Sequence, residues 1–140
     1  QFSTIKSVRF SLDGKPVHVF SGEGLLLDEP QTRLSYEDVL PAILVESPTP
    51  GQSARSTVRV YGTANVFEAV FIAEVRDAAG ATLTKKIVTA SAGTGTRGTF
   101  DVTIPFATPK TQMGSIVVYA ESAKDGSRID IVTIPLKLER

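Results

Sequence analysis

Histidine and cysteine, on which nucleophilic catalysis most often depends, are scarce in this sequence. His18 is the only histidine, and there is no cysteine. A Ser-His-Asp triad would therefore depend on the fold bringing a serine and an aspartate to His18. Without cysteine, a thiol nucleophile, a cysteine-ligated zinc site and a disulfide framework are excluded. We expect His18 to be an ordinary strand residue, and we predict that the protein is not an enzyme.

Residues 91–98 (SAGTGTRG) combine glycines with Arg97, as phosphate-binding loops do. A P-loop also needs a Lys-Ser/Thr pair that opens a helix. That pair is missing, and the residues that follow alternate as a strand does. The segment is therefore predicted to be a loop between two strands, and no cofactor is predicted.

Residues 125–130 (DGSRID) lack the alternating acids and the closing glutamate of an EF-hand. Asp125 and Gly126 instead fit a tight turn, in which the aspartate caps the turn and the glycine takes a positive φ. We predict no metal site, with a calcium ion between loops as the alternative.

Two glutamates lie within or at the end of strands that are otherwise apolar, Glu68 and Glu121. A carboxylate beside buried positions generally needs a partner. Our hypothesis is that Glu68 or Glu121 pairs with Arg97 or Arg128 and holds a loop at one end of the fold. The alternative is a solvated glutamate on an outer sheet face. The candidate ion pair or interaction surface thus comprises Glu68, Arg97, Glu121, Asp125 and Arg128.

Composition narrows the class of protein further. The chain has 140 residues, 41% of them hydrophobic, which is enough for one real core. Lys plus Arg and Asp plus Glu number 15 each, so bulk charge gives no reason to expect nucleic-acid binding. No apolar run approaches the roughly 18 residues of a membrane span.

The stretch 66–80 (VFEAVFIAEVRDAAG) is predicted to form the central strand and a hairpin loop at 77–80. Period-two alternation places one apolar set on the core face: Phe67, Ala69, Phe71, Ala73 and Val75. The other face is mixed, as on a side that is half covered or wet.

Seven short strands with turn signals between them are predicted after Pro41: 42–46, 57–62, 66–76, 82–90, 99–105, 115–122 and 129–138. This pattern indicates an all-β, immunoglobulin-like antiparallel sandwich of two sheets over residues 41–140. Lys85 and Lys86 favour an edge position for their strand. Tyr119 is either a tyrosine-corner residue or an ordinary, partly buried tyrosine.

Residues 1–40 are predicted to form an extra β-hairpin, at 5–20 with an Asp13-Gly14 turn, and a linker with at most one short helix, whose N-cap would be Ser35. An isolated two-stranded hairpin is only marginally stable in water, so this hairpin needs a surface to pack against. A second copy of the chain could supply that surface, which would make the protein a homo-oligomer. Because the sequence begins at Gln1, we expect it to be part of a longer protein whose targeting segment is not included.

Several short motifs resemble the immunoglobulin-like domain of bacterial sporulation and spore-germination proteins. They are SP at 47–48, PG at 50–51, VYGTANVFEA at 60–69, VRD at 75–77, RGTF at 97–100, IPF at 104–106 and ESAKDGS at 121–127. In addition, VRF at 8–10 and LDGKPV at 12–17 are similar to the closing hairpin of a GerM-type (GerMN) domain, which often precedes this module.

The resemblance implies a non-catalytic binding or assembly module outside the cytoplasmic membrane of a spore-former. It implies an envelope protein as partner, and attachment through an N-terminal lipid anchor or helix beyond this sequence. The alternative is a carbohydrate- or peptidoglycan-binding module, for which the candidate aromatics are Tyr36, Tyr61 and Tyr119.

Overall fold

The computed structural model describes residues 4–22 and 24–140. The chain divides into two compact units, Gln1–Leu40 and Pro41–Arg140. No helix among the described residues is both long and apolar enough to cross a membrane.

The first unit contains two minimal hairpins and one short helix. Its elements are β1 (Ser11–Leu12), β2 (Lys15–Pro16), β3 (Val19–Phe20), β4 (Leu25–Leu26) and the 3-10 helix η1 (Leu34–Val39). The predicted Asp13-Gly14 turn is confirmed, since both residues have positive φ and join β1 to β2. The predicted return strand was too long, because β3 leaves this hairpin and pairs with β4.

The helix start and the burial of this unit also differ from expectation. Ser35 lies inside η1, and its N–H donates to Thr32 Oγ1 at 3.3 Å, so Thr32 holds the first turn. Among the described residues of the unit, Leu27 is the one buried hydrophobic side chain. With two-residue strands and so small a core, the unit leaves most of its apolar side chains exposed.

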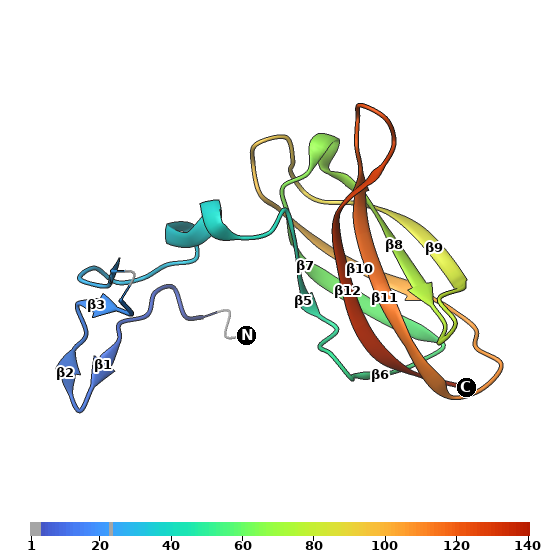
Figure 1. The fold of residues 1–140 in the computed structure, drawn as a ribbon, viewed down its shortest axis with the longest axis horizontal. Helices are drawn as coiled ribbons and strands as arrows, with labels where there is room; N and C mark the ends of the chain where they lie inside the picture. The colour runs from blue at the N-terminus through green and yellow to red at the C-terminus, as the bar shows by residue number, and fades with distance from the viewer. Residues whose placement is uncertain (1–3, 23) are drawn as a thin grey trace. The chain divides into compact units, whose positions relative to one another are not determined.

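The second unit is an immunoglobulin-like sandwich (Figure 1). One layer contains β5 (Ile43–Ser47), β7 (Thr57–Ala64) and β10 (Gly98–Pro105). The other contains β9 (Thr82–Thr89), β8 (Val70–Arg76), β11 (Gln112–Glu121) and β12 (Arg128–Glu139). The short strand β6 (Ser53–Arg55) joins them, antiparallel to β7 at one position and parallel to β12.

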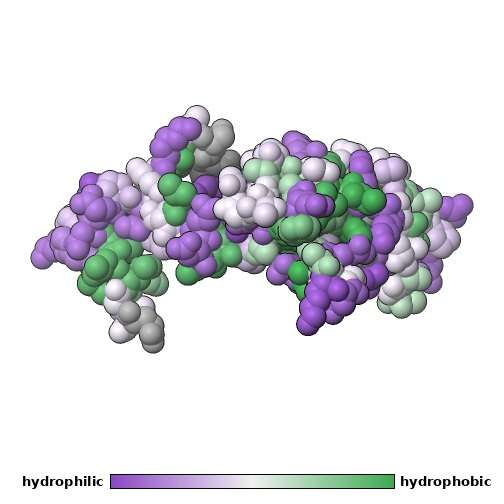
Figure 2. All heavy atoms as spheres, turned by 90° about the horizontal axis from the view of Figure 1, so that it is seen from above, coloured by the Kyte–Doolittle hydropathy of each residue, from purple (hydrophilic) through white to green (hydrophobic). Residues whose placement is uncertain are grey.

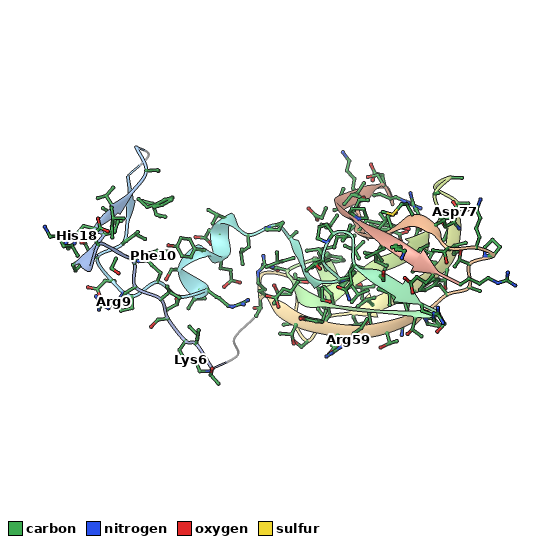
Figure 3. The ribbon with its side chains drawn as sticks, turned by 90° about the horizontal axis from the view of Figure 1, so that it is seen from below. Lys6, Arg9, Phe10, His18, Arg59 and Asp77 are labelled. Atoms are coloured by element: carbon green, nitrogen blue, oxygen red, sulfur yellow. The ribbon has the colours of Figure 1, made fainter. Side chains whose placement is uncertain are left out.

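Most predicted strands are confirmed to within a few residues. The structure adds β6, which makes eight strands among the described residues of the sandwich rather than seven. Three residues with one buried alanine carry too little alternation to predict a strand. The hairpin loop after β8 is confirmed, because Asp77 Oδ1 accepts the N–H of Ala79 at 2.9 Å and of Ala81 at 2.8 Å (Figure 3). Strand β9 is at the sheet edge, as its lysines indicated.

The core lies between the two layers. Phe71 and Phe100 meet edge to face there, with ring centroids 4.9 Å apart. Alternating residues of β8 face this core, and Phe71, Ala73 and Val75 are each at most 1% exposed.

The prediction for Phe67 was wrong. Phe67 is 58% exposed, because β8 begins only at Val70 and is preceded by the 3-10 turn η2 (Phe67–Ala69). Glu68 and Ala69 adopt φ values of 53° and 61°, in the left-handed region. This turn interrupts the period of two, so the side chain of Phe67 does not share the face of Phe71.

Candidate functional site

The turn η2 is held in place by the loop that follows β9. The N–H of Glu68 donates to Thr94 Oγ1 at 2.9 Å, and the N–H of Thr94 donates to the carbonyl of Val66 at 2.9 Å. Gly93 allows this approach, since a Cβ there would lie 2.4 Å from the nitrogen of Ala69. Residues 91–98 therefore form a loop, as predicted, and it supports η2.

A hollow of about 200 Å³ lies beside η2 on the outer face of the β9–β8–β11 sheet. It is lined by Phe67, Glu68, Val70, Phe71, Ile72, Ile87 and Glu121. Phe67, Val70 and Ile87 are 58%, 40% and 68% exposed, so large apolar side chains lie open to solvent here. We call this feature the η2 hollow.

Both predicted glutamates line the η2 hollow, and both are exposed. Within the described part of the chain, neither Glu68 nor Glu121 forms an ion pair. The predicted pairing with Arg97 or Arg128 is therefore not what the structure shows. The alternative, a solvated glutamate on the outer face, describes both residues.

The two arginines have other partners. Arg97 donates to the carbonyl of Pro41 at 2.9 Å and to Thr63 Oγ1 at 3.3 Å. Arg128 lies opposite Glu121 in the β11–β12 register, but its guanidinium contacts Glu74 Oε1 at 3.1 Å. It also lies over the ring of Tyr119, 4.1 Å from the centroid, which is a cation–π geometry.

Glu74, to which the sequence pattern assigned no role, is the buried charge of the sandwich, with only 2% of the residue exposed. Its carboxylate accepts hydrogen bonds from the hydroxyl of Tyr119 at 2.6 Å and from Nε of Arg76 at 2.9 Å. Thr82 Oγ1 donates at 3.4 Å, and Arg128 completes the set. We call these residues the Glu74 network.

The Glu74 network shifts the pKa values of Glu74 and Tyr119 in opposite directions. Burial acts to raise the pKa of Glu74, but the hydrogen bonds from Tyr119 and Arg76 and the charges of Arg76 and Arg128 lower it below the ordinary value. Burial, followed by the hydrogen bond to Glu74 and its charge, raises the pKa of Tyr119 to about 12. The carboxylate and the neutral phenol thus stabilise each other.

Tyr119 is not a tyrosine corner, because its hydroxyl bonds to a side chain rather than to backbone. It is also fully buried rather than partly buried. Period-two alternation along 70–76 and 115–121 placed Glu74 and Tyr119 on the outer faces of their strands. Their contact was not visible in the sequence, because it depends on β8 and β11 being neighbours.

Asp125 lies apart from these groups, in the turn between β11 and β12. Its Oδ1 accepts the N–H of Ser127 at 3.0 Å and the hydroxyl of Ser127 at 2.6 Å. These hydrogen bonds lower the pKa of Asp125. This is the predicted turn geometry, and the described residues contain no group of three or more His, Asp or Glu that could hold a metal.

His18 belongs to the first unit, where its Nδ1 lies 2.6 Å from Oδ1 of Asp28 (Figure 3). Both side chains are more than half exposed. Among the described residues, no hydrogen bond links His18 to a serine. The structure therefore brings an aspartate to His18 but not the nucleophile that a triad needs.

The strand order and the packed layers define an immunoglobulin-like domain. Residues 42–127, more than half of the chain, match the family Gmad2, the immunoglobulin-like domain of bacterial spore germination. The chain belongs to this family, as its motifs indicated. The match begins after the first unit, so the similarity of residues 8–17 to a GerM-type domain stays a prediction. A comparison with curated proteins gave no match.

Proposed function

We propose that the sandwich is a non-catalytic interaction or assembly module that acts in sporulation or spore germination. The observation that supports this function is the η2 hollow, where large apolar side chains remain exposed beside two glutamates. Exposed apolar patches rimmed by polar groups are typical of protein-binding sites. Membership of the spore-germination family supplies the biological setting.

The proposed partner is another protein of the cell envelope, and the proposed location is outside the cytoplasmic membrane. Anchoring would come from a lipid or helical segment beyond this sequence. The zero net charge offers no support for nucleic acid as partner. Self-association through the hairpin of residues 5–20 stays a prediction, which sedimentation velocity of the purified chain measures.

The experiment uses the full-length protein with photoreactive p-benzoylphenylalanine in place of Phe67. Sporulating and germinating cells of the source organism are irradiated, and covalent adducts are identified by mass spectrometry. The matched control carries the same residue at Thr103, which is exposed on β10 of the other sheet. We expect an envelope protein to be captured from position 67 only. Equal capture from both positions, or none from position 67, contradicts the proposal.

The positions of the three tyrosines give less support to the alternative function, binding of a glycan. Tyr119 is buried, and the hydroxyl of Tyr36 donates to Gln31 at 2.7 Å. Tyr61 lies on the outer face of β7 beneath Arg59, whose guanidinium is 5.2 Å from the ring centroid and pairs with Asp101 (Figure 3). None offers the open aromatic platform of a sugar site. Pelleting with purified peptidoglycan tests this alternative.

A further inference from the structure

We propose that the η2 hollow is a docking site for a basic, apolar segment of a partner protein. An arginine or lysine of that segment lies between Glu68 and Glu121. Bulky apolar side chains next to this cation contact Phe67, Val70 and Ile87. This inference rests on the proposed interaction function and specifies the chemistry of the partner.

The apolar part of the site continues a packed cluster. Ile72, Val117 and Tyr119 form a small buried cluster on the outer face of the sheet, separate from the main core. In the β9–β8–β11 register, Ile87 lies opposite Ile72, and Ile72 lies opposite Tyr119. Of these three cross-strand neighbours, Tyr119 and Ile72 are buried, whereas the side chain of Ile87 is exposed to solvent. A partner that covers Ile87 and Phe67 would extend this cluster.

The exposure of Phe67 is built into the backbone. Left-handed φ angles at two consecutive non-glycine residues, Glu68 and Ala69, are energetically costly and persist only where the surroundings impose them. Here Thr94 and Gly93 impose them from the neighbouring loop. Such backbone is characteristic of sites that are organised before binding, which lowers the entropic cost of association.

The charges of the site call for a cation from outside. Arg128, which lies opposite Glu121 in the register, binds Glu74 instead, as does Arg76. Among the described residues, no ion pair reaches Glu68 or Glu121, although both line the same hollow. A cation that is desolvated between two carboxylates and apolar side chains gains charge-assisted hydrogen bonds. An acidic partner or a nucleic acid would be repelled.

The geometry also favours docking on the face rather than addition of a strand to the edge. Lys86 Nζ donates to the carbonyl of Thr103 at 3.0 Å and so connects β9 to β10 along the open side of the sandwich. A lysine placed this way hinders a new strand from pairing with β9. Figure 2 looks onto the end that carries η2, where hydrophobic residues (green) lie among hydrophilic ones (purple).

The test selects ligands from a random peptide display library on the immobilised 140-residue chain. We expect selected peptides to share an arginine or lysine next to bulky apolar residues. Synthetic peptides of that consensus are then measured by fluorescence anisotropy. Glu68→Gln with Glu121→Gln should weaken binding about tenfold, and added salt should weaken it as well. Ile87→Asn should weaken binding by more, because it places an uncharged polar group in the apolar wall.

The matched control is Glu29→Gln with Asp38→Asn, which removes the same charge from exposed positions of the first unit. It should bind as the unaltered chain does. Circular dichroism of each variant verifies that it is folded, and all substituted side chains are exposed.

Three results would overturn the inference: no enrichment, a consensus without a cation, or binding unchanged in the glutamate and Ile87 variants. Competition by soluble peptidoglycan fragments would overturn it too, by assigning the hollow to a glycan. If cross-linking from position 67 still captures an envelope protein, the proposed function survives while this inference fails. If cross-linking also fails, both fail.

Discussion

The hydroxyl of Tyr119 in β11 donates a 2.6 Å hydrogen bond to the carboxylate of Glu74 in β8. Both residues are buried on the outer face of one sheet, outside the main core. Arg76 and Arg128 supply the compensating charge. The network therefore links β8, β11 and β12 on the sheet face that also carries the η2 hollow.

Glu74→Gln should destabilise the domain by about 3 kcal/mol, because it leaves two arginines facing a buried site without their counter-charge. Urea unfolding followed by circular dichroism measures this loss. Glu68→Gln serves as the control, since Glu68 is exposed, and should change stability by no more than about 0.5 kcal/mol. Equal effects of the two substitutions would show that Glu74 is not a buried partner.

The stability of the domain should fall in acid. The pKa of Glu74 is lowered in the folded state because the bonds from Tyr119 and Arg76 outweigh burial. The unfolded chain, with a glutamate pKa of about 4.3, then binds the proton more tightly. Stability from Glu74 is thus present above that pH and is lost as the pH falls through the lower folded value. Unfolding free energies at a series of pH values should show a shallower decline for Glu74→Gln.

At alkaline pH the stability of the domain should fall as the pH rises, because of Tyr119. Burial and the neighbouring carboxylate raise the pKa of Tyr119 to about 12, whereas an unfolded tyrosine has a pKa of about 10. The contribution of the neutral phenol is complete below pH of about 10 and disappears as the pH rises through about 12. Absorbance titration of phenolate should show a late transition that Tyr119→Phe removes. A difference spectrum that titrates near pH 10 would contradict this assignment.

Truncation should cost much more stability at Phe71 than at Phe67, although the sequence pattern places both on the expected core face. Phe71→Ala removes a fully buried ring and should cost about 3–5 kcal/mol. Phe67→Ala removes an exposed ring and should cost less than about 1 kcal/mol. Chemical denaturation of both variants measures the contrast. A large loss at Phe67 would mean that its ring packs into the fold.

Gly93→Ala should disturb the turn η2, which is distant from Gly93 in the sequence but in contact with it in the fold. A Cβ at this position would lie within 2.5 Å of the backbone of Ala69 and Val66, so loop and turn must separate. We expect a loss of about 1–3 kcal/mol and weaker binding at the η2 hollow. Gly22→Ala is the control, since nothing lies within 4 Å of its Cβ position. Amide hydrogen exchange at residues 66–70 should rise in the first variant only.

Much of the sandwich was predictable because its strands alternate strongly. The segments at 99–105 and 115–122 each place apolar residues at every second position, and both formed strands within a few residues of the prediction. The family motifs also lay in the sequence itself. The strand β6 was missed because its pairing with β12 depends on residues far away in the chain.

The candidate site was predictable in part. Glu68 and Glu121 were recognised as charges in apolar surroundings, and they do line one hollow. The pairing proposed for them was not found, because Arg128 reaches Glu74 instead. No local pattern distinguishes an outward glutamate that is covered from one that is solvated, since the difference lies in the neighbouring strands.

By itself, the sequence determined the fold class, the family and the turns at Asp13-Gly14, 77–80 and Asp125-Gly126, since these follow from residue type and from periodicity along the chain. Only the tertiary structure decided that Glu74 is buried and that Phe67 is exposed. Burial of Glu74 requires Tyr119 and Arg128 from strands brought beside it by pairing. Exposure of Phe67 requires left-handed backbone imposed by Thr94 and Gly93, which are distant in sequence and adjacent in space.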